Sequence, residues 1–583
     1  MPDSLAELFR AALAGRPGPW GPALLRGPAS SLPPVPRAGF EVPLRGADPV
    51  GLQQCFRLDR GDPAPVPVPP GTSEVWLEFD DARDPAAPAS TFLRFAGDRT
   101  PPDLALPPPA QRCLEALPPG ASCTHVGFMA GRPLRLVLAD LPPETWEPYL
   151  RAVGWPGDPA RAAARSDELF GVADRVRLCL DAEEERVGPR LGMELFVGPP
   201  ERFDPRWSLA LELLVAEGLC TPERRDLLLG WPGRSSPLDV PDWPASLLVR
   251  SLLDGGGRPC VLEARLSHVK VDLEPARAKG YVGLVHVPLE PLGPPVAPPP
   301  RPATSREEAC SRALGFLLGA RTQAGGWLDF PGFAEGPADE WPTAFVASVL
   351  AALPEPEARR AAARAWDLLA RRRRDGWGWN GTQPPDADST TWVLRLGQAL
   401  GHQDSEAFRR GLAFLRRHLD GREGLATYRV GAHERPVHAS WLEAHGCVTA
   451  AAAGLDALRG DLRPDGSGFW WVDGAYAAAL AAEAGFPVPE PPAAPWTPFG
   501  AALRARQAAA SGKPPDLGRL LESQLEDGSW SASAELAFPN REGLPQRPLD
   551  RARVFTTATV LAALAGPAAC GSRAGRPPAA PPP

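Results

Sequence analysis

The sequence has very few lysines and no apolar run long enough to cross a membrane. Of its 62 lysines and arginines only three are lysines, Lys270, Lys279 and Lys513, and the net charge is −8. This charge balance does not indicate a nucleic-acid partner. Because no segment approaches ~18 uninterrupted apolar residues, we expect no transmembrane helix, while a peripheral contact with a membrane stays open.

Cysteine pairs, phosphate-binding loops and regular metal-ligand spacings are also absent. The nine cysteines are scattered without a Cys-x-x-Cys pair, which is typical of reduced thiols in a cytoplasmic protein. The first residues lack a basic-then-apolar run, so we expect no signal peptide. Four nearby candidate ligands have irregular spacing, which favours structural roles: His433, His438, His445 and Cys447. We expect no metal or cofactor, except that Mg²⁺ would accompany a diphosphate substrate.

Proline is in excess, with 75 copies, and its distribution divides the chain. Residues 291–304 are so rich in proline that they cannot form a helix or a central strand, which predicts a semi-rigid linker. Residues 567–583 have the same composition and are predicted to be a disordered tail. The sequence therefore predicts a multidomain protein with one domain over residues 1–290 and another over residues 305–566.

Strand-like and helix-like pairs alternate through residues 1–290. The clearest strands cover residues 74–79, 176–180 and 261–273, and helical stretches separate them. This order predicts an α+β domain in which helices cover one side of an antiparallel sheet.

Two of the three lysines lie close together at the end of this domain, and Tyr281 follows Lys279 by two positions. A lysine retained in an arginine-biased chain indicates that a point charge is needed where a guanidinium would not fit. The alternative is that both lysines face solvent on their strands. The domain resembles the αββα barrel of the aromatic prenyltransferases, in which basic residues on inward-facing strands hold an allylic diphosphate. The resemblance implies a diphosphate-binding role for Lys270, Lys279 and Tyr281.

The second half repeats one unit several times. An amphipathic helix ends in a turn rich in glycine and aromatic residues, and an apolar helix of small residues follows; the turns recur roughly every 40 to 60 residues. This pattern predicts an all-α toroid of about five to six helical hairpins, with the apolar helices inside. The tryptophans of three turns, Trp327, Trp377 and Trp530, are predicted to be structural. The basic run of residues 371–374 ends an outer helix and is predicted to face solvent.

Two aspartates begin one of the predicted inner helices, in the segment Asp386-Ala-Asp388-Ser389-Thr390. Carboxyl groups so close together can share one proton, and burial would raise the pKa of one of them and keep it protonated. Such an acid could protonate an alkene or an epoxide. The alternative interpretation is that the aspartates only cap the helix.

Two motifs in this half carry a second resemblance. Gln524-Leu-Glu-Asp-Gly528-Ser-Trp530 matches the Gln-x3-Gly-x-Trp motif of squalene and oxidosqualene cyclases and related class II terpene cyclases, and the segment from Asp386 is similar to their Asp-x-Asp-Asp-Thr acid motif. Ser389 departs from the aspartate of that motif. The resemblance implies that Asp388 is the proton donor and Asp386 its partner.

A carbocation formed by protonation requires a dry cavity lined by aromatic faces. The candidates for this lining are Trp379, Trp392, Trp441, Trp471, Tyr476 and Phe555, each of which could instead be an ordinary core residue. The large cyclases enclose their substrate between two toroids, whereas this sequence predicts one, so the first half would have to act as the lid.

Three functions remain open from the sequence. The first is an isoprenoid-processing enzyme, a class II-like terpene cyclase that acts on a polyprenyl substrate through Asp388. The second is a prenyltransferase that acts through the first half, with the toroid as a binding module. The third is a toroid that serves as a scaffold without catalysis.

Overall fold

The computed structural model describes residues 37–566 apart from several internal segments, the longest of which lie between residues 46 and 104 and between residues 237 and 260. The predicted tail and residues 291–296 of the predicted linker lie outside the described residues. The chain divides into two compact units, Met1–Gly293 and Pro294–Pro583. None of the described helices is long and apolar enough to span a membrane.

The N-terminal unit contains an antiparallel sheet of eleven strands, which confirms the predicted antiparallel arrangement. The strands are β1 (Arg37–Pro43), β2 (Gln53–Leu58), β3 (Thr72–Phe79), β4 (Ser90–Phe95), β5 (Ser122–Phe128), β6 (Leu134–Ala139), β7 (Arg175–Ala182), β8 (Val187–Phe196), β9 (Gly233–Ser235), β10 (Cys260–Asp272) and β11 (Arg277–Pro288). β10 pairs with β8, β9 and β11, and β11 also pairs with β1, so the ladder returns to its first strand. Closure removes the unpaired edges that an open sheet would expose.

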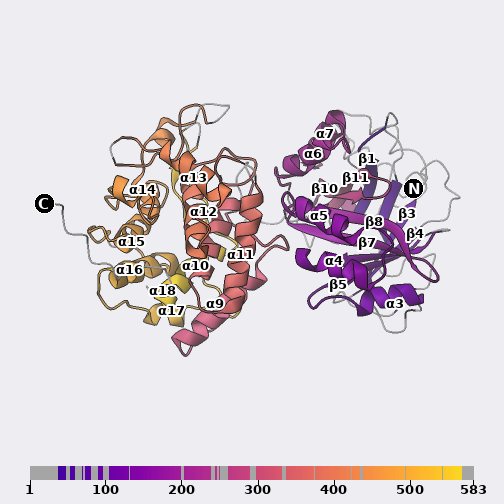
Figure 1. The fold of residues 1–583 in the computed structure, drawn as a ribbon, viewed down its shortest axis with the longest axis horizontal. Helices are drawn as coiled ribbons and strands as arrows, with labels where there is room; N and C mark the ends of the chain where they lie inside the picture. Colours follow the sequence, from indigo (N-terminus) through magenta and orange to yellow (C-terminus); the bar gives the residue numbers. More distant parts are fainter. Residues whose placement is uncertain are drawn as a thin grey trace. The chain divides into compact units, whose positions relative to one another are not determined.

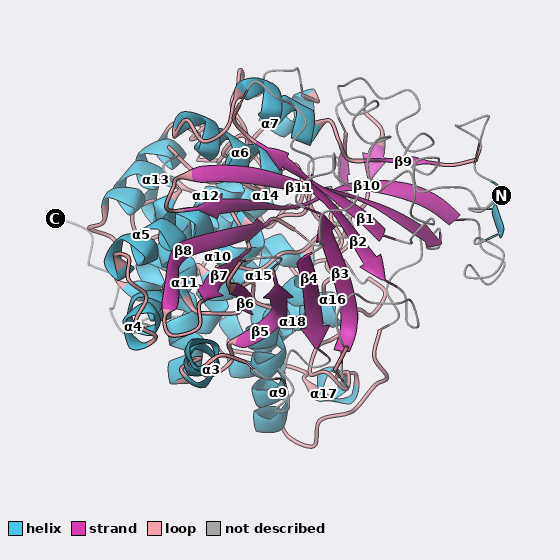
Figure 2. Ribbon diagram, turned by 90° about the vertical axis from the view of Figure 1, so that its right-hand side faces the viewer, coloured by secondary structure: helices cyan, strands magenta, loops and turns pink. Residues whose placement is uncertain are grey.

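Helices connect the strands of this sheet (Figures 1 and 2). They are α3 (Pro108–Glu115), α4 (Trp146–Ala152), α5 (Pro159–Phe170), α6 (Trp207–Ala216) and α7 (Pro222–Leu229). The alternation along β7 shows how the two faces of the sheet differ, because Val176 and Leu178 are fully buried on the apolar face. Arg177 and Cys179 point to the opposite face, since successive side chains of a strand alternate. Glu194 and Lys270, which lie opposite Arg177 in neighbouring strands, belong to the same face.

The C-terminal unit is helical apart from a short hairpin, β12 (Phe538–Pro539) and β13 (Pro545–Gln546). Its helices are α9 (Arg306–Gly319), α10 (Glu340–Ala351), α11 (Pro356–Arg371), α12 (Ala387–Leu400), α13 (Glu406–Arg416), α14 (Gly446–Ala452), α15 (Ala475–Glu483), α16 (Pro498–Ala510), α17 (Gly518–Glu522) and α18 (Val554–Ala565). α10, α12, α14, α15, α16 and α18 contact one another in that order, and α18 contacts α10 again. α11 and α13 each bury one side only (Figure 1).

The glycine- and tryptophan-rich turns form hydrogen bonds both to the outer helix before them and to the inner helix that follows. Trp327, Trp377 and Trp530 are fully buried. Their indole N–H groups donate to the carbonyl oxygens of Leu317, Leu369 and Leu520 at distances of 2.7, 2.9 and 2.8 Å. Their backbone N–H groups donate to the hydroxyls of Thr343, Thr390 and Thr557 in the first turns of α10, α12 and α18. These contacts agree with the structural role predicted for the three tryptophans.

The glycine before each of the first two tryptophans is required by this close approach. A Cβ atom on Gly326 would lie 2.8 Å from the hydroxyl of Thr343, and one on Gly376 would lie 2.8 Å from that of Thr390. Only a residue without a side chain allows the threonine to reach the backbone of the turn.

Gln524 joins the end of the helical unit to its beginning. Its side-chain Nε2 donates to the carbonyl oxygens of Ala309 in α9 at 3.0 Å and of Gly528 at 2.9 Å. The glutamine of the Gln-x3-Gly-x-Trp motif therefore links the last turn of the helical unit to its first helix, α9.

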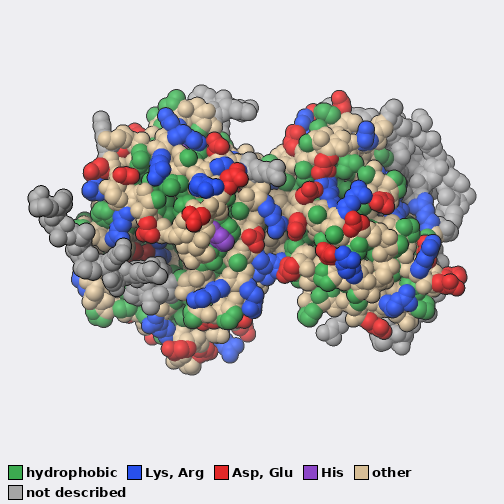
Figure 3. Space-filling model, in the orientation of Figure 1, with side chains coloured by type: hydrophobic (Ala, Val, Ile, Leu, Met, Phe, Trp, Pro, Cys, Tyr) green, Lys and Arg blue, Asp and Glu red, His purple; other side chains and the backbone are tan. Residues whose placement is uncertain are grey.

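On the face shown in Figure 3, basic and acidic side chains are interspersed and do not form a field of one sign.

Candidate active site

Asp386 is the N-cap of α12. Its Oδ1 accepts a hydrogen bond from the backbone N–H of Ser389 at 2.7 Å, and its Oδ2 accepts one from the Ser389 hydroxyl at 2.8 Å. Its own N–H donates to the carbonyl oxygen of Trp377, which fixes the start of the helix against the tryptophan turn. The side chain is buried, and this burial, with a contribution from the charge of Glu340, raises the pKa of Asp386 to about 7. Asp386 therefore caps the helix, as the alternative interpretation predicts, and also carries a strongly raised pKa.

Asp388 lies in the first turn of α12 and does not act as its cap. The residue is half-buried, and its Oδ1 is inaccessible and has no hydrogen-bond partner within the described part of the chain. Burial, followed by the negative charge of Asp386, raises the pKa of Asp388 well above its usual range. Both effects favour the protonated form of this carboxyl group.

Trp392 lies one turn further along α12, on the same face as Asp388. Its indole N–H donates to the phenol oxygen of Tyr476 in α15 at 3.0 Å. Burial, followed by the charge of Asp388, raises the pKa of Tyr476 well above its usual value, and the charge of Asp388 also raises that of the buried Cys447 in α14. Asp388 and Trp392 of α12 therefore lie near Cys447 of α14 and Tyr476 of α15.

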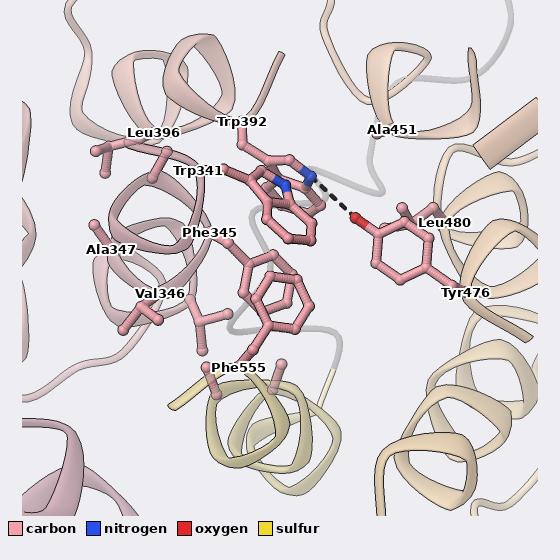
Figure 4. Packing of buried hydrophobic residues seen from close by; sticks show 14 of the residues in the cluster. Trp341, Phe345, Val346, Ala347, Trp392, Leu396, Ala451, Tyr476, Leu480 and Phe555 are labelled. Carbon is pink, nitrogen blue, oxygen red and sulfur yellow. Dashed lines mark hydrogen bonds between the residues drawn. The ribbon is translucent and has the colours of Figure 1, made fainter. Parts of the chain in front are cut away.

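Aromatic side chains from α10, α12, α15 and α18 meet in the interior of this unit (Figure 4). The rings of Phe345 and Phe555 are stacked with centroids 3.9 Å apart, and the ring of Trp392 meets that of Phe345 edge-on at 4.7 Å. The ring of Trp341 lies 4.8 Å from that of Phe555. Electron-rich ring faces in a site without bulk water stabilise nearby positive charge.

Most of the predicted lining residues belong to this cluster. Trp392, Trp471, Tyr476 and Phe555 are buried in it, with the rings of Trp471 and Tyr476 stacked at 4.4 Å. Trp379 is partly buried and stacks on Trp341 at 5.8 Å.

Trp441 occupies a different place from the other candidates. It packs against Tyr428, Trp470 and Phe538 and donates to the carbonyl oxygen of Pro539 at 2.9 Å. No described ring contact joins it to Trp341 or Phe555. The sequence analysis missed Trp341 and Phe345, although their position at the start of α10 matches that of Asp388 and Trp392 in α12.

A buried ion-pair cluster lies next to Asp386. The Glu340 carboxylate is fully buried and accepts a hydrogen bond from the Gly378 N–H at 2.7 Å. Arg372 donates to Glu340 at 2.8 Å and to Asp339 at 2.7 Å. The prediction that the basic run faces solvent is therefore wrong for Arg372, because the end of α11 lies over two acids at the start of α10. Arg373 lies outside the described residues.

Comparisons with known proteins were made for the whole chain. No family model and no curated protein matches it. Part of the chain resembles a type II terpene cyclase. MstE from Scytonema is 30% identical to this chain over 44% of its residues and 96% of MstE, with a TM-score of 0.41.

Two further solved structures are similar to this chain. A variant of MstE from Scytonema, in complex with geranylgeranyl dihydroxybenzoate as its substrate, is 29% identical over 45% of this chain and 97% of the variant, with a TM-score of 0.41. A protein from Actinoplanes is 30% identical over 46% of this chain and 100% of that protein, with a TM-score of 0.39.

The candidate metal ligands have structural contacts. The ring nitrogens of His445 lie 2.7 Å from the Thr427 hydroxyl and 2.8 Å from the Ser440 carbonyl oxygen. His438 bonds the Ser440 hydroxyl at 2.7 Å, and His433 lies outside the described residues. Within the described ranges, no group of three or more histidine, cysteine or acidic side chains is placed to hold a metal ion.

The proposed diphosphate residues of the N-terminal unit are partnered inside the sheet. Lys270 is buried, and its Nζ lies 3.4 Å from Oε1 of Glu194. Lys279 is half-buried, forms an ion pair with Glu41 and has its pKa lowered to about 8 by burial. Tyr281 stacks on His268 at 4.1 Å. The interpretation of Lys270 as a solvent-facing strand residue is wrong, because the closed ladder turns this face inward.

Proposed function

We propose that the C-terminal unit is an α/α toroid that works as a class II-like terpene cyclase. The observation that supports this is the carboxyl group of Asp388, whose pKa is raised well above its usual value by burial and by the charge of Asp386, and whose buried Oδ1 has no hydrogen-bond partner among the described residues. It belongs to the same neighbourhood as the aromatic cluster of Trp392 and Tyr476. An acid held in this way is suited to a weakly basic substrate, the terminal alkene or epoxide of a polyprenyl chain.

The reaction requires one proton from Asp388. Its O–H bond breaks while the alkene π electrons, or an epoxide oxygen, take the proton and a carbocation forms at the more substituted carbon. For an epoxide, the C–O bond at this carbon breaks. The next alkene of the chain attacks the carbon, and the last cation loses a proton to solvent to leave a neutral cyclised product. Asp388 then regains a proton from solvent, which restores the acid. The rings of Trp341, Phe345 and Phe555 stabilise the cations along this path.

Two neighbouring carboxyl groups, those of Asp386 and Glu340, influence the pKa of Asp388. While Asp386 is charged, it opposes the ionisation of Asp388, and Glu340 opposes the ionisation of Asp386 in turn. The charge of Asp386 thereby adds to the effect of burial and favours the protonated form of Asp388.

The substitution Asp388→Asn tests this function, because the amide has nearly the same shape and no acidic proton. With polyprenyl alkenes and epoxides of different lengths as substrates, we expect a loss of turnover of about 10²–10⁴-fold. Asp456→Asn, at an exposed position after α14, is the matched control and should retain full turnover. Full activity of Asp388→Asn would contradict the proposal. If the unit were only a scaffold, neither the wild type nor Asp388→Asn would turn over an isoprenoid.

A second candidate function, prenyl transfer, concerns the N-terminal unit. It is favoured by the enclosed, charged and aromatic face on which Lys270, Glu194, His268 and Tyr281 lie together. In this activity, the C1–O bond of an allylic diphosphate breaks and an electron-rich aromatic acceptor attacks C1. Pyrophosphate and the proton of the acceptor leave. Acceptor-dependent release of pyrophosphate by the full-length protein measures this activity, and Asp388→Asn should not change it.

A further inference from the structure

Six helices of the C-terminal unit contact one another in a closed order, and each carries an interior side chain at its second residue. In the order α10, α12, α14, α15, α16 and α18, these second residues are Trp341, Asp388, Cys447, Tyr476, Phe499 and Phe555. We call this set the interior series. All its members are at least nine-tenths buried except Asp388, which is half-buried. Figure 4 shows Trp341, Tyr476 and Phe555 directed from their helices toward a common centre.

Neighbouring members of the interior series interact with one another. The charge of Asp388 contributes to the raised pKa of Tyr476. The ring centroid of Phe499 lies 6.4 Å from that of Tyr476 and 6.2 Å from that of Phe555. The rings of Phe555 and Trp341 are 4.8 Å apart. The series therefore continues from the acid through the phenyl rings to Trp341.

The indole N–H of Trp341 is buried without an acceptor. The residue is 3% exposed, and the described part of the chain offers its Nε1 no hydrogen-bond partner. By contrast, the indole N–H groups of Trp327, Trp377 and Trp530 donate to carbonyl oxygens, and that of Trp392 donates to a phenol oxygen. Buried donors without acceptors are rare because they cost stability. The N–H of Trp341 is therefore suited to an acceptor that a ligand supplies.

This N–H lies on the helix next to the one that carries the acid. Glu340 precedes Trp341, and its carboxylate accepts a hydrogen bond of 2.7 Å from the N–H of Gly378, in the turn before α12. The charge of Glu340 also contributes to the raised pKa of Asp386, the cap of α12. Oδ1 of Asp388 is likewise buried and has no hydrogen-bond partner among the described residues. Two polar groups without partners thus occupy adjacent positions of the interior series.

We propose that Trp341 is a specificity-determining residue of the cyclase site, and that its indole N–H donates a hydrogen bond to an oxygen atom at the end of the substrate that Asp388 protonates. This inference rests on the proposed function. Of the two substrate classes that suit Asp388, an epoxide supplies such an oxygen, whereas a terminal alkene leaves the N–H of Trp341 unpaired. An epoxide oxygen has two lone pairs, so it can accept the N–H bond and the proton together.

The hydrogen bond from Trp341 is present before and after the epoxide opens. The O–H bond of Asp388 breaks, its proton passes to the epoxide oxygen, and the C–O bond at the more substituted carbon breaks with its electron pair on the oxygen. The oxygen becomes a hydroxyl group on the neighbouring carbon and still accepts the N–H of Trp341. An interaction of equal strength in both states contributes to binding and orientation, and therefore to KM more than to kcat.

Trp341→Phe tests the inference, because it keeps an aromatic ring and removes the N–H. The full-length protein is assayed with two polyprenyl chains of equal length, one ending in an alkene and the other in an epoxide. We expect the ratio of kcat/KM for the epoxide to that for the alkene to fall about 10-fold, through KM of the epoxide. Trp471→Phe reduces another ring of the same cluster and is the matched control, in which both substrates should change alike.

A polyprenyl methyl ketone measures the same hydrogen bond without turnover. Its oxygen accepts a hydrogen bond, and the saturated hydrocarbon of equal length is the reference. We expect Trp341→Phe to weaken calorimetric binding of the ketone about 10-fold relative to that of the hydrocarbon. Thermal unfolding shows whether the variant is folded; if it is not, benzothienylalanine at position 341 keeps both rings and has sulfur in place of the N–H.

The two assays separate failure of this inference from failure of the proposed function. If the wild type turns over neither substrate, the cyclase function is contradicted, and the ketone still tests the N–H of Trp341. An unchanged ratio of epoxide to alkene turnover in the folded Trp341 variants would overturn the inference while the cyclase function stands. Unchanged relative binding of the ketone in these variants would overturn it as well.

Discussion

The indole N–H of Trp392 donates a hydrogen bond of 3.0 Å to the phenol oxygen of Tyr476, across 84 residues of sequence. This bond joins α12, which carries the acid, to α15 on another side of the aromatic cluster. Both side chains are almost fully buried. Their contact therefore fixes the orientation of two rings next to Asp388.

We predict that Tyr476→Phe lowers the free energy of unfolding by about 1–3 kcal/mol, because the buried indole N–H of Trp392 loses its acceptor. Chemical unfolding measures the change. Trp392→Phe combined with Tyr476→Phe removes both partners, and the double-mutant cycle should give a favourable interaction energy between them. An interaction energy of zero would show that the bond does not stabilise the fold.

The stability of the protein should depend on pH through Asp386. Its pKa is about 7 in the folded state against an ordinary value of 3.8, so the folded protein binds more protons than the unfolded chain between these values. Its contribution to stability is present below about pH 4 and is lost as the pH rises to about 7. Asp386→Asn keeps the cap without the titration. Its unfolding free energy should therefore vary less than that of the wild type between pH 5 and pH 8.

Glu340→Gln should shift the pH profile of turnover. The amide oxygen can still accept the Gly378 N–H, and Arg372 keeps Asp339 as a partner. Burial remains the main cause of the raised pKa of Asp386, but the contribution from the Glu340 charge disappears. Asp386 then ionises more readily and opposes the ionisation of Asp388 more strongly, so we expect the basic limb of the kcat profile to move to higher pH. A lower kcat with an unchanged profile would indicate a role in folding alone.

Gln524→Ala should destabilise the C-terminal unit by about 2–3 kcal/mol, because the two hydrogen bonds of a fully buried side chain are lost. Gln546→Ala, at a half-buried position in β13, is the control. Calorimetric unfolding of both variants measures the difference. Equal unfolding temperatures would show that Gln524 does not help to close the ring of helices.

The repeated turns could be predicted from the sequence because they are local. The glycine and tryptophan of each turn are adjacent or nearly so, and the threonine that the tryptophan contacts follows after 16, 13 and 27 residues, at the start of the next predicted inner helix. The two aspartates are local in the same way, and the motif indicated both the cap and the acid. Their raised pKa values, in contrast, depend on burial, which a motif does not determine.

The features that the sequence did not reveal depend on distant pairings. Lys270 meets Glu194 across 76 residues, and Arg372 meets Glu340 across 32, so neither arrangement follows from its own segment. The same holds for the closure of β1 on β11. Trp441 likewise meets Trp470 and Phe538, which lie far from it in the sequence, so its place could not be derived from its own segment.

The hydrogen bonds of Gln524 bring the two ends of the helical unit together, and Arg306 at the start of α9 also donates to the carbonyl oxygen of Leu564 near the end of α18. Adjacent ends are the condition under which circular permutation is tolerated. A chain cut between α12 and α13, with its old ends joined by a short linker, would keep every helix beside its present neighbours. The packing of this unit therefore does not require that α9 be its first helix.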